Sequence, residues 1–512
     1  MYFNLQLMIQ APLNIIFSHS ADYTSGLLIT LRENALNFIS ENMIVLAVLQ
    51  LFLLALMYLW YRRKLKKQKE EIENEFYDKN QEIILQKDKA EKLLSNLLPQ
   101  QTAEELQSTG KVSSRRFRMV TVLFSDIHGF TKIVEQMNPE DLIDELDKFF
   151  MHFDTIVEKF NIEKIKTVGD AYMCAGGIPN KNRTNPIEVI LAAMEIQQYM
   201  KSMKINSKAG KKGIWGLRIG VHTGPVIAGV VGTKKVSYDI WGDTVNTASR
   251  MESSGSVSEI NISGMTYMLI KDFFICEYRG RMPVKYKGNI DMYFVKGFKP
   301  NMSSDLKGLV PNQHFQTQFQ MLRYDDLEEA ILTKLENELP KNLYYHNLKH
   351  TIDVITEVEI IGRKEGLSDA EMLIIKTAAL FHDTGFILSY NEHEECSVKM
   401  ARHILPKYFY SEQQINEISN LIMHTKFPPQ PKTNLEMIIC DADLDYLGRT
   451  DFIPVSGNLY RELKEHGKIK SIDDWNRLQI KFIENHQYFT ETARNMRDVN
   501  KIRQLDKLRE LI

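Results

Sequence analysis

Cysteine is scarce in this chain, which has four cysteines in 512 residues: Cys174, Cys276, Cys396 and Cys440. No two of them have a CxxC or zinc-finger spacing, and scattered cysteines in a chain of this length are typical of a reducing compartment. The sequence therefore argues against a disulfide scaffold and a zinc finger. We interpret the four cysteines as small core residues.

Net charge is also small, because 64 basic residues nearly balance 66 acidic ones and leave a formal charge of −2. Without a basic excess, no nucleic-acid partner is indicated. The first 42 residues lack a basic n-region and a clear cleavage site, so we do not predict a removed signal peptide there. The length is too great for one core and predicts roughly two to four domains.

Residues 43–61 form a long apolar run that contains one glutamine and no charged residue, which is enough to span a bilayer. Trp60 and two tyrosines lie at its end, as in an interfacial belt. Six basic residues follow: Arg62, Arg63, Lys64, Lys66, Lys67 and Lys69. The positive-inside rule then places the rest of the chain in the cytoplasm. We predict a single-pass protein of the cell (inner or plasma) membrane, with a short extracytoplasmic segment over 1–42.

Residues 62–98 are highly charged and contain neither glycine nor proline. Phe76, Ile83, Ala90 and Leu97 recur every seven residues, but the companion series is half polar. This pattern favours a weak parallel coiled coil. We predict a helical stalk over 62–110, which is either a signalling element or a passive spacer.

Two apolar runs typical of strands each end in an aspartate beside a glycine turn. Asp126 lies in TVLFSDIHGFT (121–131), and Asp170 lies in IKTVGDAYM (165–173). Magnesium takes one or two carboxylates and fills its other positions with water and phosphate oxygens. A single aspartate of this kind is usually a turn former, whereas two together indicate a site for a hard cation.

The stretch YDIWGDTVNTASR (238–250) predicts a turn at Gly242–Asp243 followed by a helix. Asn246 and Arg250 are four residues apart, so they share one face of that helix. An amide beside a guanidinium suits a sugar oxygen and a phosphate. A surface helix that carries the two by chance is the alternative.

Together, the motifs FSDIHGFT, KIKTVGDAYM, GVHTGPVIAG and YDIWGDTVNTASRM resemble the class III nucleotidyl cyclase catalytic domain, over about 118–298. The resemblance implies a ferredoxin-like α/β domain, placed here at 115–300, that is active as a homodimer with its site at the interface. It implies two Mg²⁺ or Mn²⁺ ions on Asp126 and Asp170, with the Ile127 carbonyl. Asn246 would orient the ribose, and Arg250 would stabilise the α-phosphate in the transition state. The segment 90–106 is similar to the helix–Pro–helix linker of membrane-bound cyclases.

The resemblance also bears on the base. Adenylate cyclases of this family use Lys and Asp where guanylate cyclases carry Glu and Cys, and here the positions are Lys166 and Asp239. A lysine can donate to adenine N1 and an aspartate can accept from N6, so ATP is the predicted substrate. Lys287, or else Lys285, lies where the family places a triphosphate-binding lysine, although exposed lysines are more often only solubilising.

The chain becomes polar and irregular after residue 298, and we predict a linker over 301–324. Beyond it the periodicity is helical and histidines recur. His346 and His350 share one helix face, and His382–Asp383 ends an apolar helix. Further candidates follow: His393, His424, Asp441 and Asp443. Imidazoles and carboxylates that converge on buried faces suit Mn²⁺, Fe²⁺, Mg²⁺ or Zn²⁺.

Residues 325–512 resemble the HD superfamily of metal-dependent phosphohydrolases. The resemblance implies one or two divalent metals. It places the ligands at His350, His382, Asp383 and Asp443, with Asp441 as the alternative to Asp443 and His393 and His424 as candidates for a second metal. His346 matches the general acid of cyclic-nucleotide phosphodiesterases. Cyclic nucleotides, alarmones and nucleoside phosphates all stay open as substrates.

The prediction is a multidomain protein with one transmembrane helix, a helical stalk, an α/β ferredoxin-like cyclase domain and an all-α HD domain. It dimerises through stalk and cyclase domains and converts ATP to 3′,5′-cyclic AMP and pyrophosphate. Its HD domain hydrolyses a phosphoester. The alternatives are a guanylate cyclase, and a cyclase tuned by a non-catalytic, nucleotide-binding HD domain.

Overall fold

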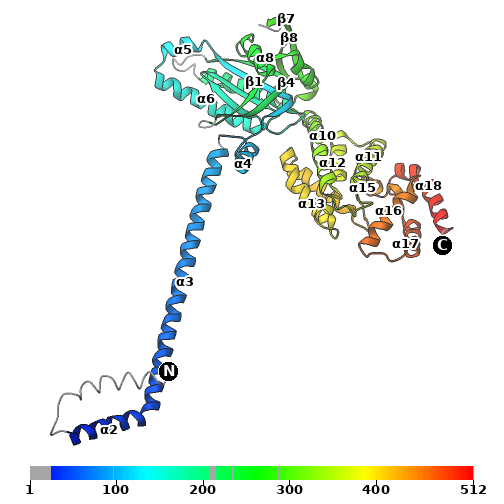
Figure 1. Cartoon of the computed structure of the whole chain (residues 1–512). Coiled ribbons are helices and arrows are strands. Elements are labelled where there is room, and N and C mark those ends of the chain that lie inside the picture. Colours follow the sequence, from blue (N-terminus) through cyan, green and yellow to red (C-terminus); the bar gives the residue numbers. More distant parts are fainter. Residues whose placement is uncertain (1–24, 96, 207–214, 233–235, 285–287, 511–512) are drawn as a thin grey trace. The chain divides into compact units, whose positions relative to one another are not determined.

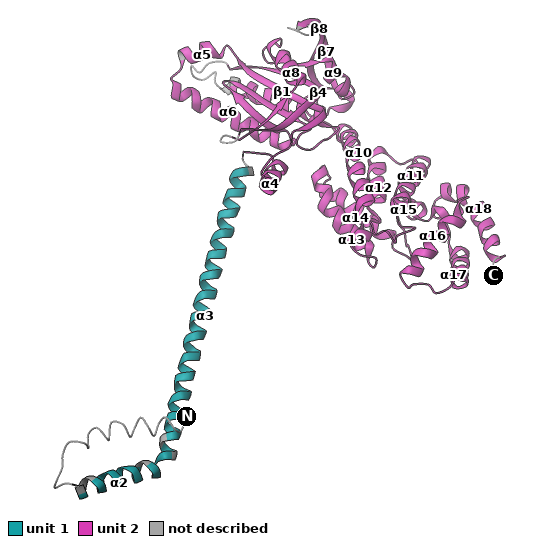
Figure 2. Ribbon diagram, in the orientation of Figure 1, with its two compact units in different colours: residues 1–96 teal, residues 97–512 magenta. Residues whose placement is uncertain are grey.

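The structure is a computed structural model that describes residues 25–95, 97–206, 215–232, 236–284 and 288–510 (Figure 1). The chain divides into two compact units, residues 1–96 and 97–512, which Figure 2 shows in teal and magenta.

The first unit contains α2 (Ser25–Glu41) and α3 (Met43–Ser95). The single helix α3, of 53 residues, includes both the predicted membrane span and most of the predicted stalk. Lys–Glu pairs four residues apart line its charged part, such as Lys79–Glu75 at 2.6 Å. Such exposed pairs support a helix only weakly, because water and salt screen them.

A membrane-spanning helix is not confirmed: among the described residues, no helix is long and apolar enough to cross a membrane. The predicted span includes positions 44 and 46, whose side chains lie outside the described residues. Most of the predicted extracytoplasmic segment, residues 1–24, lies outside them too.

The second unit begins with α4 (Gln100–Thr109), which follows Pro99, and continues with an eight-stranded sheet. The strand order is β2-β3-β1-β4-β6-β8-β7, and β5 pairs with β4. The strands are β1 (Arg115–His128), β2 (Glu163–Val168), β3 (Ala171–Gly176), β4 (Gly216–Val231), β5 (Ser237–Trp241), β6 (Ile260–Ser263), β7 (Phe274–Val284) and β8 (Gly288–Phe298). The helices of this sheet domain are α5 (Phe130–Gln136), α6 (Pro139–Lys159), α7 (Asn185–Asn206), α8 (Asp243–Ser253) and α9 (Gly264–Ile270).

The central strands β1 and β4 carry long apolar runs because helices cover them, and Val122, Leu123 and Val221 are fully buried. Gly220 on β4 allows α8 to lie against the sheet. A Cβ at this position would lie 1.8 Å from the backbone nitrogen of Glu252, at the end of α8. A larger residue there would therefore displace the helix that carries Asn246 and Arg250.

The rest of the second unit is helical and forms a second core. Its α-helices are α10 (Gln313–Glu338), α11 (Leu348–Lys364), α12 (Asp369–Phe381), α13 (His393–Ile404), α14 (Glu412–His424), α15 (Asn434–Asp443), α16 (Phe452–Glu465), α17 (Ile472–Asn485) and α18 (Glu491–Arg509). Four 3₁₀ turns accompany the C-terminal part: η2 (Pro300–Met302), η3 (Thr384–Ile387), η4 (Leu405–Tyr408) and η5 (Asp445–Gly448). Capping boxes begin α12, α14 and α15, which explains why these helices start at Ser368, Ser411 and Thr433.

Helix α10 belongs to both cores. Phe315 and Phe319 pack into the core of the sheet domain, whereas Leu327 and Ile331 pack into the core of the helical domain. The predicted linker over 301–324 therefore includes the first three turns of α10, which Asn312 caps through the backbone N–H of Phe315.

Arg323, in the middle of α10, forms a largely buried ion pair with Glu188 of α7. Its Nη2 lies 3.1 Å from Glu188 Oε1, and the side chains are 12% and 1% exposed. The guanidinium also lies over the rings of Phe319 and Phe409, 4.2 and 3.9 Å from their centroids. One side chain thus links the sheet domain to the helical domain.

We expect Arg323→Met to lower the free energy of unfolding by about 3–5 kcal/mol, because the Glu188 carboxylate would stay buried without its partner. Burial already raises the pKa of Glu188 against the opposing effect of Arg323. The folded protein therefore binds the Glu188 proton more tightly than the unfolded chain does. The loss of unfolding free energy in Arg323→Met should shrink as the pH falls from neutral through the raised pKa of Glu188. Thermal unfolding at several pH values measures both effects.

The double variant Arg323→Met/Glu188→Gln is the control, since it removes both charges. It should recover most of the lost unfolding free energy, and the loss that remains should not depend on pH. An equal loss in the single and double variants would contradict the role of the buried charge.

Candidate functional site

Asp126 and Asp170 come together through strand register. Asp126 lies near the end of β1, and Asp170 lies in the turn that joins β2 to β3. Ser125 pairs with Tyr172 across the β1–β3 ladder, so the next residue of β1 lies beside that turn. Ile127 follows Asp126 in β1, with its side chain buried.

The two carboxyl groups are close enough to perturb one another. Burial raises the pKa of Asp170 to about 6, and a hydrogen bond and repulsion from Asp126 contribute in the same direction. Two carboxylates held together in this way fit divalent cations, which would remove their mutual repulsion.

Arg218 and Glu252 adjoin this pair, and the sequence analysis missed both. Arg218 lies opposite Asp126 in the β1–β4 ladder, and its Nη2 is 2.5 Å from Asp126 Oδ2. Its Nε lies 3.0 Å from Glu252 Oε1. Burial raises the pKa of Glu252 to about 7 although Arg218 opposes the rise. The contact between Arg218 and Asp126 follows from the register of β1 against β4. No sequence motif contains both residues, so the sequence alone does not reveal it.

Lys166 and Asp239 lie side by side, although they are on different strands. Lys166 Nζ is 2.6 Å from Asp239 Oδ2, and Asp239 Oδ1 accepts the backbone N–H of Ile240. The pair therefore presents one donor and one acceptor next to one another at the edge formed by β2 and β5.

Asn246 and Arg250 are exposed on one face of α8. Among the described hydrogen bonds and ion pairs, none joins either residue to Asp126 or Asp170. Lys285 and Lys287 lie outside the described residues. The predicted cyclase residues thus fall into three groups: the carboxylate pair, the Lys166–Asp239 pair and the α8 face.

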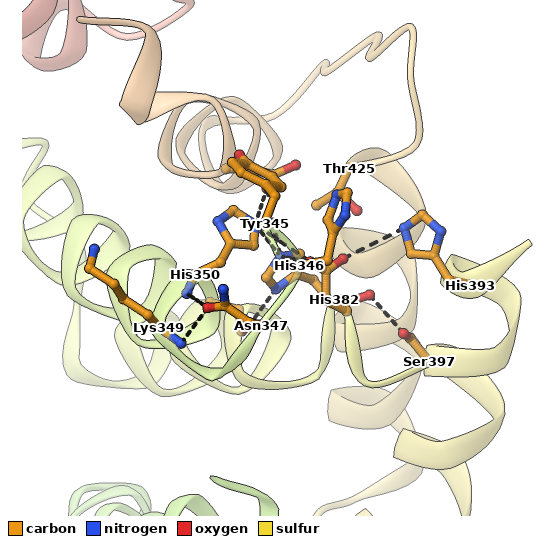
Figure 3. A network of polar contacts seen from close by, with 12 residues as sticks. Tyr345, His346, Asn347, Lys349, His350, His382, His393, Ser397 and Thr425 are labelled. Carbon is orange, nitrogen blue, oxygen red and sulfur yellow. Dashed lines mark hydrogen bonds and ion pairs between the residues drawn. The ribbon is translucent and has the colours of Figure 1, made fainter. Parts of the chain in front are cut away.

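A second cluster lies in the helical domain, where four predicted ligands converge. Figure 3 labels two of them, His350 and His382. His350 is in α11, His382 and Asp383 follow α12, and Asp443 ends α15. His350 Nε2 lies 3.1 Å from Asp443 Oδ1 and 3.4 Å from Asp383 Oδ2. His382 Nε2 lies 3.2 Å from Asp383 Oδ2 and 3.3 Å from His350 Nε2.

These residues fit a divalent metal. His382 Nδ1 donates to the Ala379 carbonyl at 2.8 Å, which leaves Nε2 as the ligand atom. Asp383 Oδ2 is buried and accepts no hydrogen bond among the described residues. Burial lowers the pKa of His382, but Asp383 and Asp443 outweigh burial and raise it to about 9. A cation at this point would displace that proton.

Gly385 and Ser397 hold the His382–Asp383 turn against α13. A Cβ at Gly385 would lie 1.9 Å from the His393 carbonyl oxygen, so only glycine permits this approach. Ser397 Oγ donates to the His382 carbonyl at 2.7 Å and accepts the Gly385 N–H at 2.8 Å. Figure 3 shows Ser397 below His393 on α13.

The other predicted ligands have different surroundings. His393 Nε2 lies 3.6 Å from Asp383 Oδ1, at the edge of the cluster. His424 Nε2 lies 3.5 Å from Glu436, and the described contacts do not join it to the cluster. Asp441 accepts two backbone N–H groups and the hydroxyl of Thr490, all at 2.8 Å, so it anchors the start of α18.

Glu462 of α16 holds His346, and the sequence analysis missed it too. His346 Nδ1 lies 2.5 Å from Glu462 Oε1, and the backbone N–H groups of Tyr345 and His346 donate to Oε2. Burial would raise the pKa of this fully buried carboxyl, but the hydrogen bonds from His346 and the two amides hold it below its usual value. Nothing in the sequence around position 462 marks this role.

Two family matches cover these two sites. Residues 112–297 match the family described as the adenylate and guanylate cyclase catalytic domain, and residues 347–445 match the HD domain. Cyclase domains of this family use two divalent metals, and HD domains bind divalent metals, which agrees with the predicted cofactors.

Among similar proteins, the receptor-type guanylate cyclase gcy-5 of Caenorhabditis elegans is 37% identical over 46% of this chain and 21% of its own length. Human guanylyl cyclase C is 34% identical over 55% of this chain and 27% of its own length. The chain thus spans about a quarter of the length of these curated relatives.

Two solved structures are also similar. The guanylate cyclase domain of RhGC from Catenaria anguillulae, in complex with GTP, is 36% identical with a TM-score of 0.34, and 36% of this chain covers all of it. The adenylyl cyclase CyaB from P. aeruginosa is 30% identical with a TM-score of 0.36, and 37% of this chain covers all of it. From the family matches, the chain carries an adenylate and guanylate cyclase catalytic domain followed by an HD domain.

Proposed function

We propose that the protein is an adenylate cyclase that converts ATP to 3′,5′-cyclic AMP and pyrophosphate at the interface of a homodimer. The observation that carries this proposal is that one sheet domain holds both a carboxylate pair suited to divalent metals and a Lys166–Asp239 pair suited to adenine.

In this proposal Asp126 and Asp170, with the Ile127 carbonyl, hold the two metals, Mg²⁺ or Mn²⁺. When bound, these ions favour ionisation of the ribose 3′-hydroxyl and neutralise the triphosphate. Arg250 donates to the α-phosphate as its charge develops, and Asn246 holds the ribose. Both side chains are exposed on α8, where a second subunit can meet them.

The choice of ATP depends on hydrogen-bond direction. The Lys166 ammonium only donates and the Asp239 carboxylate only accepts. Adenine offers an acceptor at N1 and a donor at N6, whereas guanine offers a donor at N1 and an acceptor at O6. With the lysine facing ring position 1, the pair therefore matches adenine.

We expect the double variant Lys166→Glu/Asp239→Cys to shift the ratio of kcat/KM for ATP over GTP toward GTP by roughly 100-fold or more, because an unmatched buried donor or acceptor is costly. Initial rates with Mn²⁺ and each nucleotide measure the shift. Lys164→Glu is the control, since this lysine lies on the same strand but pairs with Asp154. An unchanged ratio in the double variant would count against the base assignment.

A guanylate cyclase is the second candidate. The two curated relatives named above, gcy-5 and human guanylyl cyclase C, are guanylate cyclases with 37% and 34% identity to this chain. The wild-type ratio of kcat/KM for ATP over GTP decides between an adenylate and a guanylate cyclase. A preference for GTP would overturn the adenylate assignment.

For the HD domain we propose metal-dependent hydrolysis of a phosphoester. His350, His382, Asp383 and Asp443 would hold a divalent metal, which when bound activates water. His346 donates a proton to the leaving oxygen, and Glu462 keeps the imidazole in place and protonated. A non-catalytic domain that binds a nucleotide and tunes the cyclase is the alternative.

We also propose that α3 anchors the protein in a membrane. Leu51, Phe52, Leu53 and Leu54 are consecutive and 66%, 60%, 59% and 55% exposed, so apolar side chains surround the helix. A helix that is apolar on all sides needs an apolar environment. The full chain should therefore sediment with membranes after alkaline extraction, while a variant without residues 43–61 should stay in the supernatant. Release of the full chain by alkali alone would overturn the anchor.

A further inference from the structure

A cavity of about 480 Å³ lies beside the HD metal ligands. Asp383, Asp443 and His346 line one end of it. The remaining wall is mostly apolar and includes Phe427, Leu459, Leu463, Trp475, Leu478 and Phe482. The cavity is large enough for a molecule much bigger than a phosphate ion.

Among the described residues, no lysine or arginine lines this cavity. The acidic residues that line it are Asp383, Asp443 and Glu394, the lining histidines are His346 and His393, and Thr425 and Gln479 are neutral. Proteins usually bind chains of phosphates with several lysine or arginine side chains in addition to metal ions.

Two basic side chains that adjoin the predicted metal ligands are paired with carboxylates. Lys349 and Arg449 line a separate cleft of about 50 Å³ on another side of the metal ligands. Lys349 Nζ lies 2.6 Å from Asp353, and Arg449 contacts Asp353 at 2.9 Å and Asp451 at 2.7 Å. Lys426 lies in the sequence between Thr425 and Phe427, which line the cavity, but its ammonium pairs with Glu395.

From this charge pattern we propose that the HD site accepts a phosphoester with one phosphoryl group and an uncharged, planar or apolar remainder, of which a nucleoside 3′,5′-cyclic monophosphate is an example, and rejects nucleotides with a phosphate chain. The proposal rests on the proposed hydrolytic function. Water adds its oxygen to phosphorus and releases one proton to solvent, the ester P–O bond breaks, and the leaving oxygen takes a proton from His346, which regains a proton from solvent. The metal end binds the single phosphoryl group, and the apolar wall covers the remainder.

The experiment uses the full-length Asp126→Ala variant, so that the cyclase does not consume the nucleotides. Hydrolysis with Mn²⁺ is compared for cyclic AMP, cyclic GMP, ATP, GTP and guanosine 3′-diphosphate 5′-diphosphate. Binding of each is measured by calorimetry with Mn²⁺, on the same variant with His346→Ala added to slow hydrolysis. We expect the cyclic monophosphates to be preferred in both measurements by roughly tenfold or more.

Leu478→Arg places a cation in the cavity wall at a position that is 49% exposed, so the fold should tolerate it. It should move the preference toward the phosphate chains by roughly tenfold. Ile472→Arg, in the same helix α17 and also at 49% exposure, does not line the cavity and should leave the preference unchanged.

The two proposals fail differently. A wild-type preference for ATP, GTP or the tetraphosphate would overturn the single-phosphoryl assignment but leave the hydrolase proposal intact. Selective binding of cyclic monophosphates without hydrolysis of any compound would support the assignment and overturn hydrolysis. Binding of no compound, with no hydrolysis, would overturn both.

Discussion

Asp126→Ala should abolish cyclic-nucleotide formation, with kcat reduced by roughly a thousandfold or more. The substitution removes one of the two carboxylates that adjoin one another in the sheet domain, and Asp170 alone would hold the metals poorly. Arg250→Ala should have a comparable effect, because it removes the donor that we propose stabilises the α-phosphate. Product formation from ATP with Mn²⁺ measures both losses.

Mixing the two inactive variants tests the homodimer. If one subunit contributes Asp126 and its partner contributes Arg250, a mixed dimer contains one intact site, and random assortment should restore about a quarter of the wild-type rate. The control mixes Asp126→Ala with the double variant Asp126→Ala/Arg250→Ala, which contains no Asp126 and should recover nothing. No recovery in the first mixture would place the whole site in one chain.

His382→Ala/Asp383→Ala should remove the metal from the HD domain and lower its hydrolytic rate by roughly a thousandfold. His382 and Asp383 supply a ligand nitrogen and a buried carboxylate oxygen that accepts no hydrogen bond among the described residues. Metal content after dialysis, measured by elemental analysis, gives a readout that does not depend on knowing the substrate.

His424→Ala is the matched control. His424 is another histidine at a helix end, but its Nε2 lies beside Glu436, so the variant should keep its metal. Loss of metal from His424→Ala would show that this histidine is a ligand after all.

The same variants show whether the two domains act on one messenger. If the HD domain hydrolyses the product of the cyclase, cyclic AMP should accumulate further in the His382→Ala/Asp383→Ala variant than in wild type during a time course with ATP. Equal accumulation would leave the cyclase proposal intact and assign the HD domain another substrate or a regulatory role.

The sequence predicted two domains with separate chemistries, and the family matches confirm a cyclase catalytic domain and an HD domain. It could do so because the motifs are local. A strand end beside a glycine turn, or two side chains four residues apart on a helix, can be recognised from neighbouring residues alone. Asp126, Asp170 and the Asn246–Arg250 face were all found in this way.

The contacts that complete each site join residues far apart in the chain. His346 and Glu462 are separated by 116 positions, and Lys166 and Asp239 by 73. The resemblance to a family suggested the Lys166–Asp239 pair, but no pattern around position 462, 218 or 252 suggested the partners found there. The start of helix α10 is a similar case. Phe315 and Phe319 belong to the core of the sheet domain, but they lie within the stretch 301–324 that the sequence predicts as a linker.

The sequence by itself therefore determined the two domain types and a set of candidate site residues, since both depend on local motifs. Only the tertiary structure decided which charges face one another, which cations are already paired with a carboxylate, and that a mostly apolar cavity without lysine or arginine adjoins the predicted metal ligands. Strand register and helix packing bring these residues together, and both depend on the whole core rather than on any short segment.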